Sequence, residues 1–73
     1  MAIEEKSPAD LVQLAMAGAR IVLDGRRYAA RDLSSIAKAL RPEGLLTIVN
    51  CEGKATHELI SVVSAAPGKV MIA

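Results

Sequence analysis

Aromatic side chains are nearly absent from this sequence of 73 residues, which contains one Tyr and neither Phe nor Trp. Proteins that bind single-stranded nucleic acids stack the bases on aromatic rings, and one ring does not make such a surface. The net charge of +1 also provides no basic field for a phosphate backbone. We therefore expect no nucleic-acid partner.

Cysteine and histidine are equally scarce, because Cys51 and His57 are the single residues of their types. A disulfide within the chain needs two cysteines, and a structural zinc site needs several Cys and His ligands. We expect neither, and no cofactor. Residues 1–6 are Met-Ala-Ile-Glu-Glu-Lys and lack the apolar run of a signal peptide. No stretch approaches the roughly 20 apolar residues of a membrane span, so we expect a cytoplasmic protein with no membrane partner.

Hydrophobic residues make up 52% of the chain and charged residues 23%, which is typical of a folded protein and not of a disordered tail. At this length a single core buries only about 60% of the surface of the unfolded chain. We expect one domain over residues 1–73, in which residues 1–6 lead into the fold. A multidomain enzyme is excluded.

A repeated pattern indicates the architecture. An acidic residue stands just before a leucine in residues 7–11, 29–33 and 55–59, and apolar residues follow three, four and seven positions later. This spacing predicts an amphipathic helix in each copy. The positions are Leu11, Leu14, Ala15 and Gly18, then Leu33, Ile36, Ala37 and Leu40, then Leu59, Val62, Val63 and Ala66.

Each predicted helix ends near a glycine or proline, and a short run of branched residues then predicts a strand at 21–23, 45–49 and 70–72. The repeat units cover about 7–24, 29–50 and 55–73. Strands linked through single helices run parallel with right-handed crossovers. We predict an α/β fold of three helix-strand repeats, solenoid-like, with a small parallel sheet in the order 1-2-3 and helices mainly on one face. The alternative is the order 2-1-3 with helices on both faces.

The three helix starts differ in their capping residues. Ser7, Pro8 and Asp10 supply an N-cap, a proline at the first helical position and a capping box. Ala29 and Ala55 stand at the equivalent cap positions and offer no side-chain cap. The acidic residues three positions later complement the helix dipole, so we interpret them as structural and not as catalytic carboxylates.

Residues 45–51, Leu-Leu-Thr-Ile-Val-Asn-Cys, resemble the strand of a leucine-rich repeat, which ends near Asn or Cys before a helix. The aligned leucines are 22 residues apart between Leu11 and Leu33 and 26 apart between Leu33 and Leu59, within the range of that class. Asp24 stands at the end of the first strand in place of Asn. The resemblance implies a stacked α/β solenoid that binds other proteins and does not catalyse a reaction.

Residues 21–25, Ile-Val-Leu-Asp-Gly, followed by a helix and by residues 46–50, are also similar to the middle of a STAS domain, the fold of anti-sigma-factor antagonists. That family carries a phosphorylatable serine at the helix start, where this chain has Tyr-Ala-Ala-Arg at residues 28–31. The resemblance implies a regulatory module that binds a protein partner.

Side chains alternate across a strand, so each predicted strand divides into two sets. One face of the sheet is assigned Val22, Leu46, Ile48, Val70 and Ile72. The other face is assigned Ile21, Leu23, Thr47, Val49, Met71 and Ala73. Both sets are mainly apolar, whereas helices connecting strands in the order 1-2-3 cover only one face.

The uncovered apolar face predicts self-association. Below about 70–80 residues a lone core rarely contributes more than about 3–5 kcal/mol, and the two outer strands also have unpaired edges. We expect identical chains to associate through the second set of residues or through the strand edges, into a closed oligomer or an open filament. A different protein is the other candidate partner.

Three basic residues form a candidate binding site. Arg26 and Arg27 follow the first predicted strand, and Lys54 lies in the equivalent loop after the second, where strand ends and helix starts both suit anions. Residues 53–56 are not a P-loop, because that motif needs Gly at position 48 and Ser or Thr at position 55, where this chain has Ile and Ala.

The remaining reactive side chains have structural interpretations. Cys51 and His57 lie near each other in sequence, but a catalytic pair needs a third, orienting group that is not evident. A partly buried cysteine at the end of a strand is the more common arrangement. Tyr28 is expected to fill the space beside a helix start with its hydroxyl in solvent. We therefore expect no catalytic residue.

Together these observations predict a non-enzymatic, self-associating structural or scaffold protein. The first alternative is a STAS-like regulatory module that binds a protein partner. The second is a small anion- or nucleotide-binding domain that uses Arg26, Arg27 and Lys54.

Overall fold

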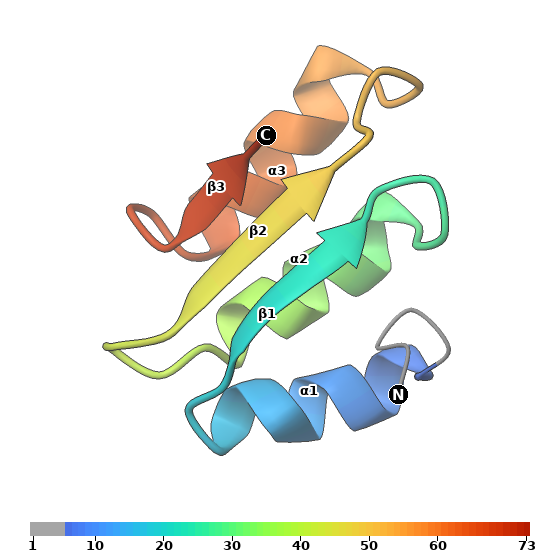
Figure 1. Cartoon of the computed structure of the whole chain (residues 1–73). Helices are drawn as coiled ribbons and strands as arrows, with labels where there is room; N and C mark the ends of the chain where they lie inside the picture. The colour runs from blue at the N-terminus through green and yellow to red at the C-terminus, as the bar shows by residue number, and fades with distance from the viewer. Residues whose placement is uncertain (1–5) are drawn as a thin grey trace.

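The computed structural model describes residues 6–73, so most of the predicted lead lies outside the described residues. Helices and strands alternate along the chain (Figure 1). The elements are α1 (Pro8–Met16), β1 (Arg20–Asp24), α2 (Ala30–Lys38), β2 (Leu45–Val49), α3 (Thr56–Ala65) and β3 (Val70–Ile72). The strands form a parallel sheet in the order β1-β2-β3, and the helices lie behind it on one side. The predicted fold class and strand order are confirmed, and the order 2-1-3 is excluded.

The helix starts follow the predicted capping residues. Ser7 accepts a hydrogen bond on its Oγ from the backbone N–H of Asp10 at 3.2 Å, and α1 ends before Gly18, whose φ of 98° closes the helix. Ala29 and Ala55 have nearly the same cap conformation as Ser7 but no side-chain oxygen. At α3 the Glu58 carboxylate accepts the N–H of Ala55 at 2.9 Å, so half of a capping box is present.

The strand register corrects the predicted face assignment of β1. Ile21 pairs with Leu46 and Leu23 pairs with Ile48, and all four are buried beneath the helices. The prediction that Ile21 and Leu23 belong to the uncovered face is therefore wrong. The opposite parity would turn the Arg20 side chain, which is exposed here, toward the core, and burial of its charge costs far more than exposure of Val22.

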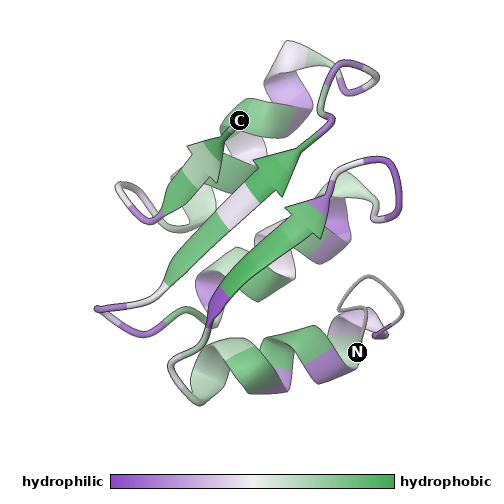
Figure 2. Cartoon of the chain, in the orientation of Figure 1, coloured by the Kyte–Doolittle hydropathy of each residue, from purple (hydrophilic) through white to green (hydrophobic). Residues whose placement is uncertain are grey.

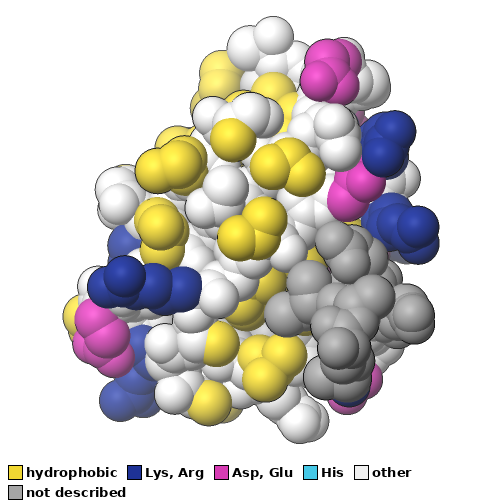
Figure 3. All heavy atoms as spheres, in the orientation of Figure 1, with side chains coloured by type: hydrophobic (Ala, Val, Ile, Leu, Met, Phe, Trp, Pro, Cys, Tyr) yellow, Lys and Arg dark blue, Asp and Glu magenta, His cyan; other side chains and the backbone are white. Residues whose placement is uncertain are grey.

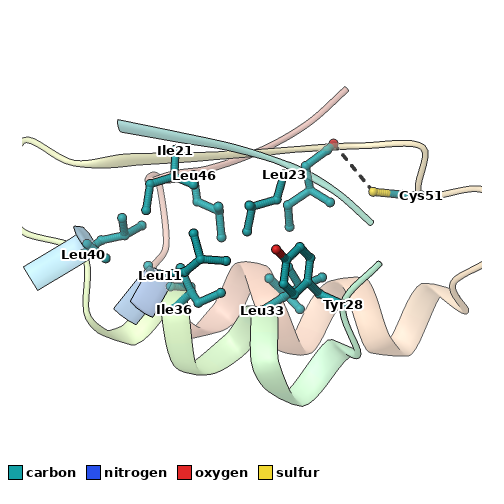
Figure 4. Close-up of a cluster of buried hydrophobic side chains, with 14 residues drawn as sticks. Leu11, Ile21, Leu23, Tyr28, Leu33, Ile36, Leu40, Leu46 and Cys51 are labelled. Atoms are coloured by element: carbon teal, nitrogen blue, oxygen red, sulfur yellow. Dashed lines mark hydrogen bonds between the residues drawn. The ribbon is translucent and has the colours of Figure 1, made fainter. Parts of the chain in front are cut away.

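The core lies between the sheet and the helix layer (Figure 4). Strand side chains point down onto the helices, and Tyr28 fills the end of the cluster beside Leu33. The largest fully buried side chains are Leu11, Ile21, Leu23, Leu33, Ile36, Leu46, Ile48 and Val62. Figure 2 shows that the strands are strongly hydrophobic, whereas the hydrophilic residues gather at strand ends and in the loops.

Candidate functional site

The side of the sheet opposite the helices carries an exposed apolar row. Val22 pairs with Thr47, and Thr47 pairs with Met71, so these three side chains lie at one level across the sheet. Val22 is 55% exposed, Met71 is 51% exposed, and Thr47 between them is half-buried. Figure 3 looks directly at this side and shows hydrophobic side chains across its middle, with Lys and Arg toward its rim. We call this surface, made of Val22, Thr47, Val49 and Met71, the open face.

The sequence-predicted interface is therefore only partly on the open face. Thr47, Val49 and Met71 lie there, and Ala73 continues the same alternation just after β3 with an exposed side chain. Ile21 and Leu23 lie on the covered face, and Val22 replaces them. Arg20, two residues before Val22 in β1, was the signal for this placement, because its charged side chain lies on the side of the strand that faces water.

Both outer strands have a free edge. On β3, the Lys69 carbonyl accepts from Leu46 and the Ala73 N–H donates to Ile48, so these odd-numbered residues face β2. Backbone groups alternate along a strand, and those of Val70 and Ile72 therefore point to the outer edge. On β1, Gly25 donates to β2, so the odd-numbered residues face β2 and the backbone groups of Val22 point outward. Within residues 6–73, the outward groups of Val22, Val70 and Ile72 have no backbone hydrogen bond, whereas the outward Asp24 carbonyl at the end of β1 accepts from the Arg27 N–H at 3.1 Å.

The predicted cationic site is altered by an ion pair. Arg26 Nη2 lies 2.9 Å from Asp24 Oδ2, and the Arg26 backbone N–H donates to Oδ1 of the same carboxylate at 2.9 Å. These side-chain and backbone hydrogen bonds hold the pKa of Asp24 well below its usual range, and the pair raises the pKa of Arg26. Of the three predicted cations, Arg27 is exposed and Lys54 is half-buried in the neighbouring loop, while Arg26 is exposed and paired with Asp24.

The ends of β1 and β2 are held close together. The Gly25 N–H donates to the Val49 carbonyl at 2.7 Å, and Asn50 then turns the chain with a φ of 57°. Asn is one of the few side chains that adopt this left-handed conformation at low cost. The Asn50 side chain also contributes a hydrogen bond that lowers the pKa of Asp24. This end of the sheet is a structural turn cluster.

Cys51 and His57 lie in different surroundings. The Cys51 side chain is buried, and its Sγ lies 3.6 Å from the Ile48 carbonyl oxygen, drawn as a dashed line in Figure 4. Burial raises the pKa of the Cys51 thiol, which disfavours the thiolate that nucleophilic chemistry needs. His57 is exposed at the start of α3, and the structure gives no hydrogen bond between these two side chains in the part of the chain it describes.

The comparisons with known proteins add no family. No protein-family model, no curated protein and no solved structure matches this chain. Among the described residues, no group of His, Cys, Asp and Glu side chains is placed to hold a metal ion. In the same part of the chain, no helix has the length and apolar character needed to cross a bilayer.

Tyr28 anchors the segment before α1. Its ring is buried, and its hydroxyl donates a hydrogen bond to the Lys6 carbonyl at 2.9 Å. We predicted that this hydroxyl reaches solvent, whereas the structure shows it in a partly buried hydrogen bond to the backbone of Lys6. Burial of a tyrosine hydroxyl without such a partner is costly, and this bond ties Lys6, just before α1, to the residue that precedes the cap of α2.

Proposed function

We propose that this chain is a non-enzymatic structural domain that binds further copies of itself through its open face and strand edges. The observation that carries the proposal is the exposure of Val22 and Met71 in the middle of a parallel sheet. Parallel sheets are normally covered on both faces. Complete burial of one such side chain contributes about 1.5–3 kcal/mol, so a second copy on this surface stabilises both partners.

The size of the domain supports the same proposal. A chain of 73 residues without a disulfide has a small core, and domains of this size commonly gain stability from oligomerisation. The two free strand edges offer backbone groups that another strand can bind. A second copy supplies both an apolar face and a strand edge of the required kind.

The two alternative functions have less support. An anion site loses Arg26 to its ion pair with Asp24. A STAS-like phosphorylation switch needs an accessible hydroxyl at the start of α2, where Tyr28 is buried and is followed by two alanines.

Sedimentation equilibrium from micromolar to millimolar concentration tests the proposal. The wild-type chain is expected to exceed the mass of a monomer, and the double variant Val22→Lys, Met71→Lys is expected to sediment as a monomer. A matched control places two lysines at Ser35 and Ser61, which are exposed positions in the middle of α2 and α3. This control should associate like the wild type. A wild-type monomer at every concentration overturns the proposal.

A further inference from the structure

The helix layer covers β1 and β2 more completely than β3. Leu23, Ile48 and Ile72 lie at one level on the covered face, because each pairs with the next across the sheet. Leu23 and Ile48 are 0% exposed, whereas Ile72 is 41% exposed. The side chain on the last strand therefore lacks a cover that its two equivalents possess.

Helix α3 is also less buried than the two helices before it. Leu59 is the third copy of the position held by Leu11 and Leu33, which are both 0% exposed, yet Leu59 is only partly buried. The next repeated position shows the same difference. Its first two copies, Ala15 and Ala37, are buried, and its third copy, Val63, is partly exposed. The outer side of α3 and β3 is thus an apolar surface formed by Leu59, Val63 and Ile72. We call it the tail surface.

At the opposite end of the molecule, α1 also has an apolar side chain that is less buried than its equivalents. Leu14 is the first copy of the position held by Ile36 and Val62, which are both 0% exposed, but Leu14 is partly exposed. It lines a groove on α1 together with Lys6, Asp10 and Gln13. In Figure 1, α1 lies beyond the outer edge of β1 with no strand in front of it. We call this end the head surface.

We propose that copies of this chain join head to tail, with β3 of one copy parallel to β1 of the next. In this joint, α1 of the next copy covers the tail surface of the first. The inference rests on the self-association in the proposed function and specifies its strand-edge contact, which leaves the open face free for a separate contact. A second copy is the favoured occupant because the exposed side chains at each end are those that the adjoining repeat buries elsewhere in the chain. The joint therefore continues the contacts already made between α1 and α2 and between α2 and α3.

Continuation of the levels already present in the sheet gives the register that we assign to this joint. Ile21 and Val70 both lie at the level of Leu46, so a continued sheet pairs Val70 with Ile21 of the next copy. Met71 then pairs with Val22 of the next copy on the open face, and Ile72 pairs with Leu23 on the covered face. The outward backbone groups of Val70 and Ile72 meet the outward groups of Val22, as a parallel ladder requires. One register thus satisfies both the faces of the sheet and its hydrogen bonds.

The joint is heterologous, because the tail surface of one copy binds the head surface of another. Such contacts leave one free surface at each end and build open filaments unless the rotation closes a ring. Two blocked variants test this directly. Leu14→Lys blocks the head surface and Ile72→Lys blocks the tail surface. Each variant alone is expected to be a monomer, and an equal mixture is expected to form dimers, because one intact head and one intact tail remain. Circular dichroism checks that both variants are folded.

Cross-linking tests the register without weakening the fold. Val22 and Met71 of one copy are separated by β2, at about twice the strand spacing of about 4.8 Å, beyond the reach of a disulfide. Across the proposed joint they are one strand spacing apart. The double variant Val22→Cys, Met71→Cys is expected to give a ladder of linked chains on a non-reducing gel. Each single variant, and the wild type with its buried Cys51, should give no ladder.

The outcomes separate this interface from the proposed function. A wild-type monomer overturns both. Oligomers that persist in both Leu14→Lys and Ile72→Lys overturn the head-to-tail joint alone. A dimer linked by Met71→Cys by itself also overturns the joint, because it shows β3 beside a second β3 or two open faces packed together.

Discussion

Gly25 lies where the end of β1 passes closest to β2. A Cβ atom at this position would lie 3.1 Å from the Val49 carbonyl oxygen and 3.2 Å from Ile48 Cγ2. The first neighbour is backbone, and the Gly25 N–H is already bonded to it, so neither can move away cheaply. The close approach of two strands therefore depends on a missing side chain.

We predict that Gly25→Ala lowers the free energy of unfolding by about 1–3 kcal/mol, the usual effect of overpacking. Urea denaturation measures it. Gly53→Ala is the matched control, because nothing lies within 4 Å of its Cβ and its φ is not in the left-handed region. That variant should be neutral or more stable by up to about 1 kcal/mol, since alanine restricts the unfolded chain. Equal effects from the two substitutions would contradict the steric explanation.

Asp24 gives the fold a dependence on acid. Its pKa in the folded chain lies below the unfolded value near 4 because Arg26 donates side-chain and backbone hydrogen bonds to the carboxylate. Below the unfolded pKa the unfolded chain takes up a proton that the folded chain does not. The stabilisation from Asp24 is therefore present above about pH 4 and is lost as the pH falls below it.

Asp24→Asn is expected to lower stability at pH 7 and to have a smaller effect at pH 3, so that the two unfolding curves converge in acid. Thermal melts at both pH values measure this. The asparagine keeps an oxygen for the Arg26 N–H, so the turn itself is preserved. Parallel losses at both pH values would show that the carboxylate charge is not the cause.

At the scale of elements, the three helices differ in the residue at the N-cap, which is Ser7, Ala29 or Ala55. Ala29 is exposed and has φ and ψ of −71° and 156°, almost the values of −71° and 158° at Ser7. A serine at position 29 can therefore cap α2 as Ser7 caps α1. We predict that Ala29→Ser raises the free energy of unfolding by about 0.5–2 kcal/mol. Ala30→Ser, one residue inside the helix, should be neutral or slightly destabilising, and chemical denaturation of both variants decides the matter.

The helices and strands could be predicted from local patterns, because each depends on residues within one turn or one strand. The pairing of Ile21 with Leu46 could not, since it links segments 25 residues apart in the sequence and depends on how α2 packs. Arg20, two residues before Val22, contained the missing information, because its charge favours the exposed side of β1. The contact of Tyr28 with the Lys6 carbonyl is non-local in the same way. The ion pair of Asp24 with Arg26 is local, and an aspartate that ends a strand two residues before an arginine was its sequence signal.

For the molecule as a whole, the repeated helices explain why equivalent apolar side chains are buried to different extents. Each helix covers the gap between its own strand and the neighbouring one, so repeats in the middle of a stack are buried and repeats at its ends are not. Ile72 at one end and Leu14 at the other are the side chains that show this deficit. An added copy removes both deficits at once, whereas packing of two open faces removes neither.

The proposed head-to-tail joint also predicts how assembly responds to salt. Continuation of the register places Lys69 of one copy opposite Arg20 of the next, since Arg20 pairs with Leu45 and Lys69 comes one residue before Val70, the partner of Leu46. Like charges at opposed positions destabilise a pair of strands by about 0.2–1 kcal/mol, and salt screens this repulsion. Association should therefore tighten as ionic strength rises, by up to about fivefold in the dissociation constant. Light scattering across a salt series measures the change.

Lys69→Glu provides the matched test, because it replaces a repulsive pair with an attractive one at the same place. This variant should associate more tightly than the wild type at low salt, and its association should weaken as salt is added. A charge reversal at Lys38, which is exposed at the end of α2 and away from the sheet, should leave the salt dependence of the wild type unchanged. If Lys69→Glu and the wild type respond to salt in the same direction, these two cations do not meet, and copies do not join through β3 and β1.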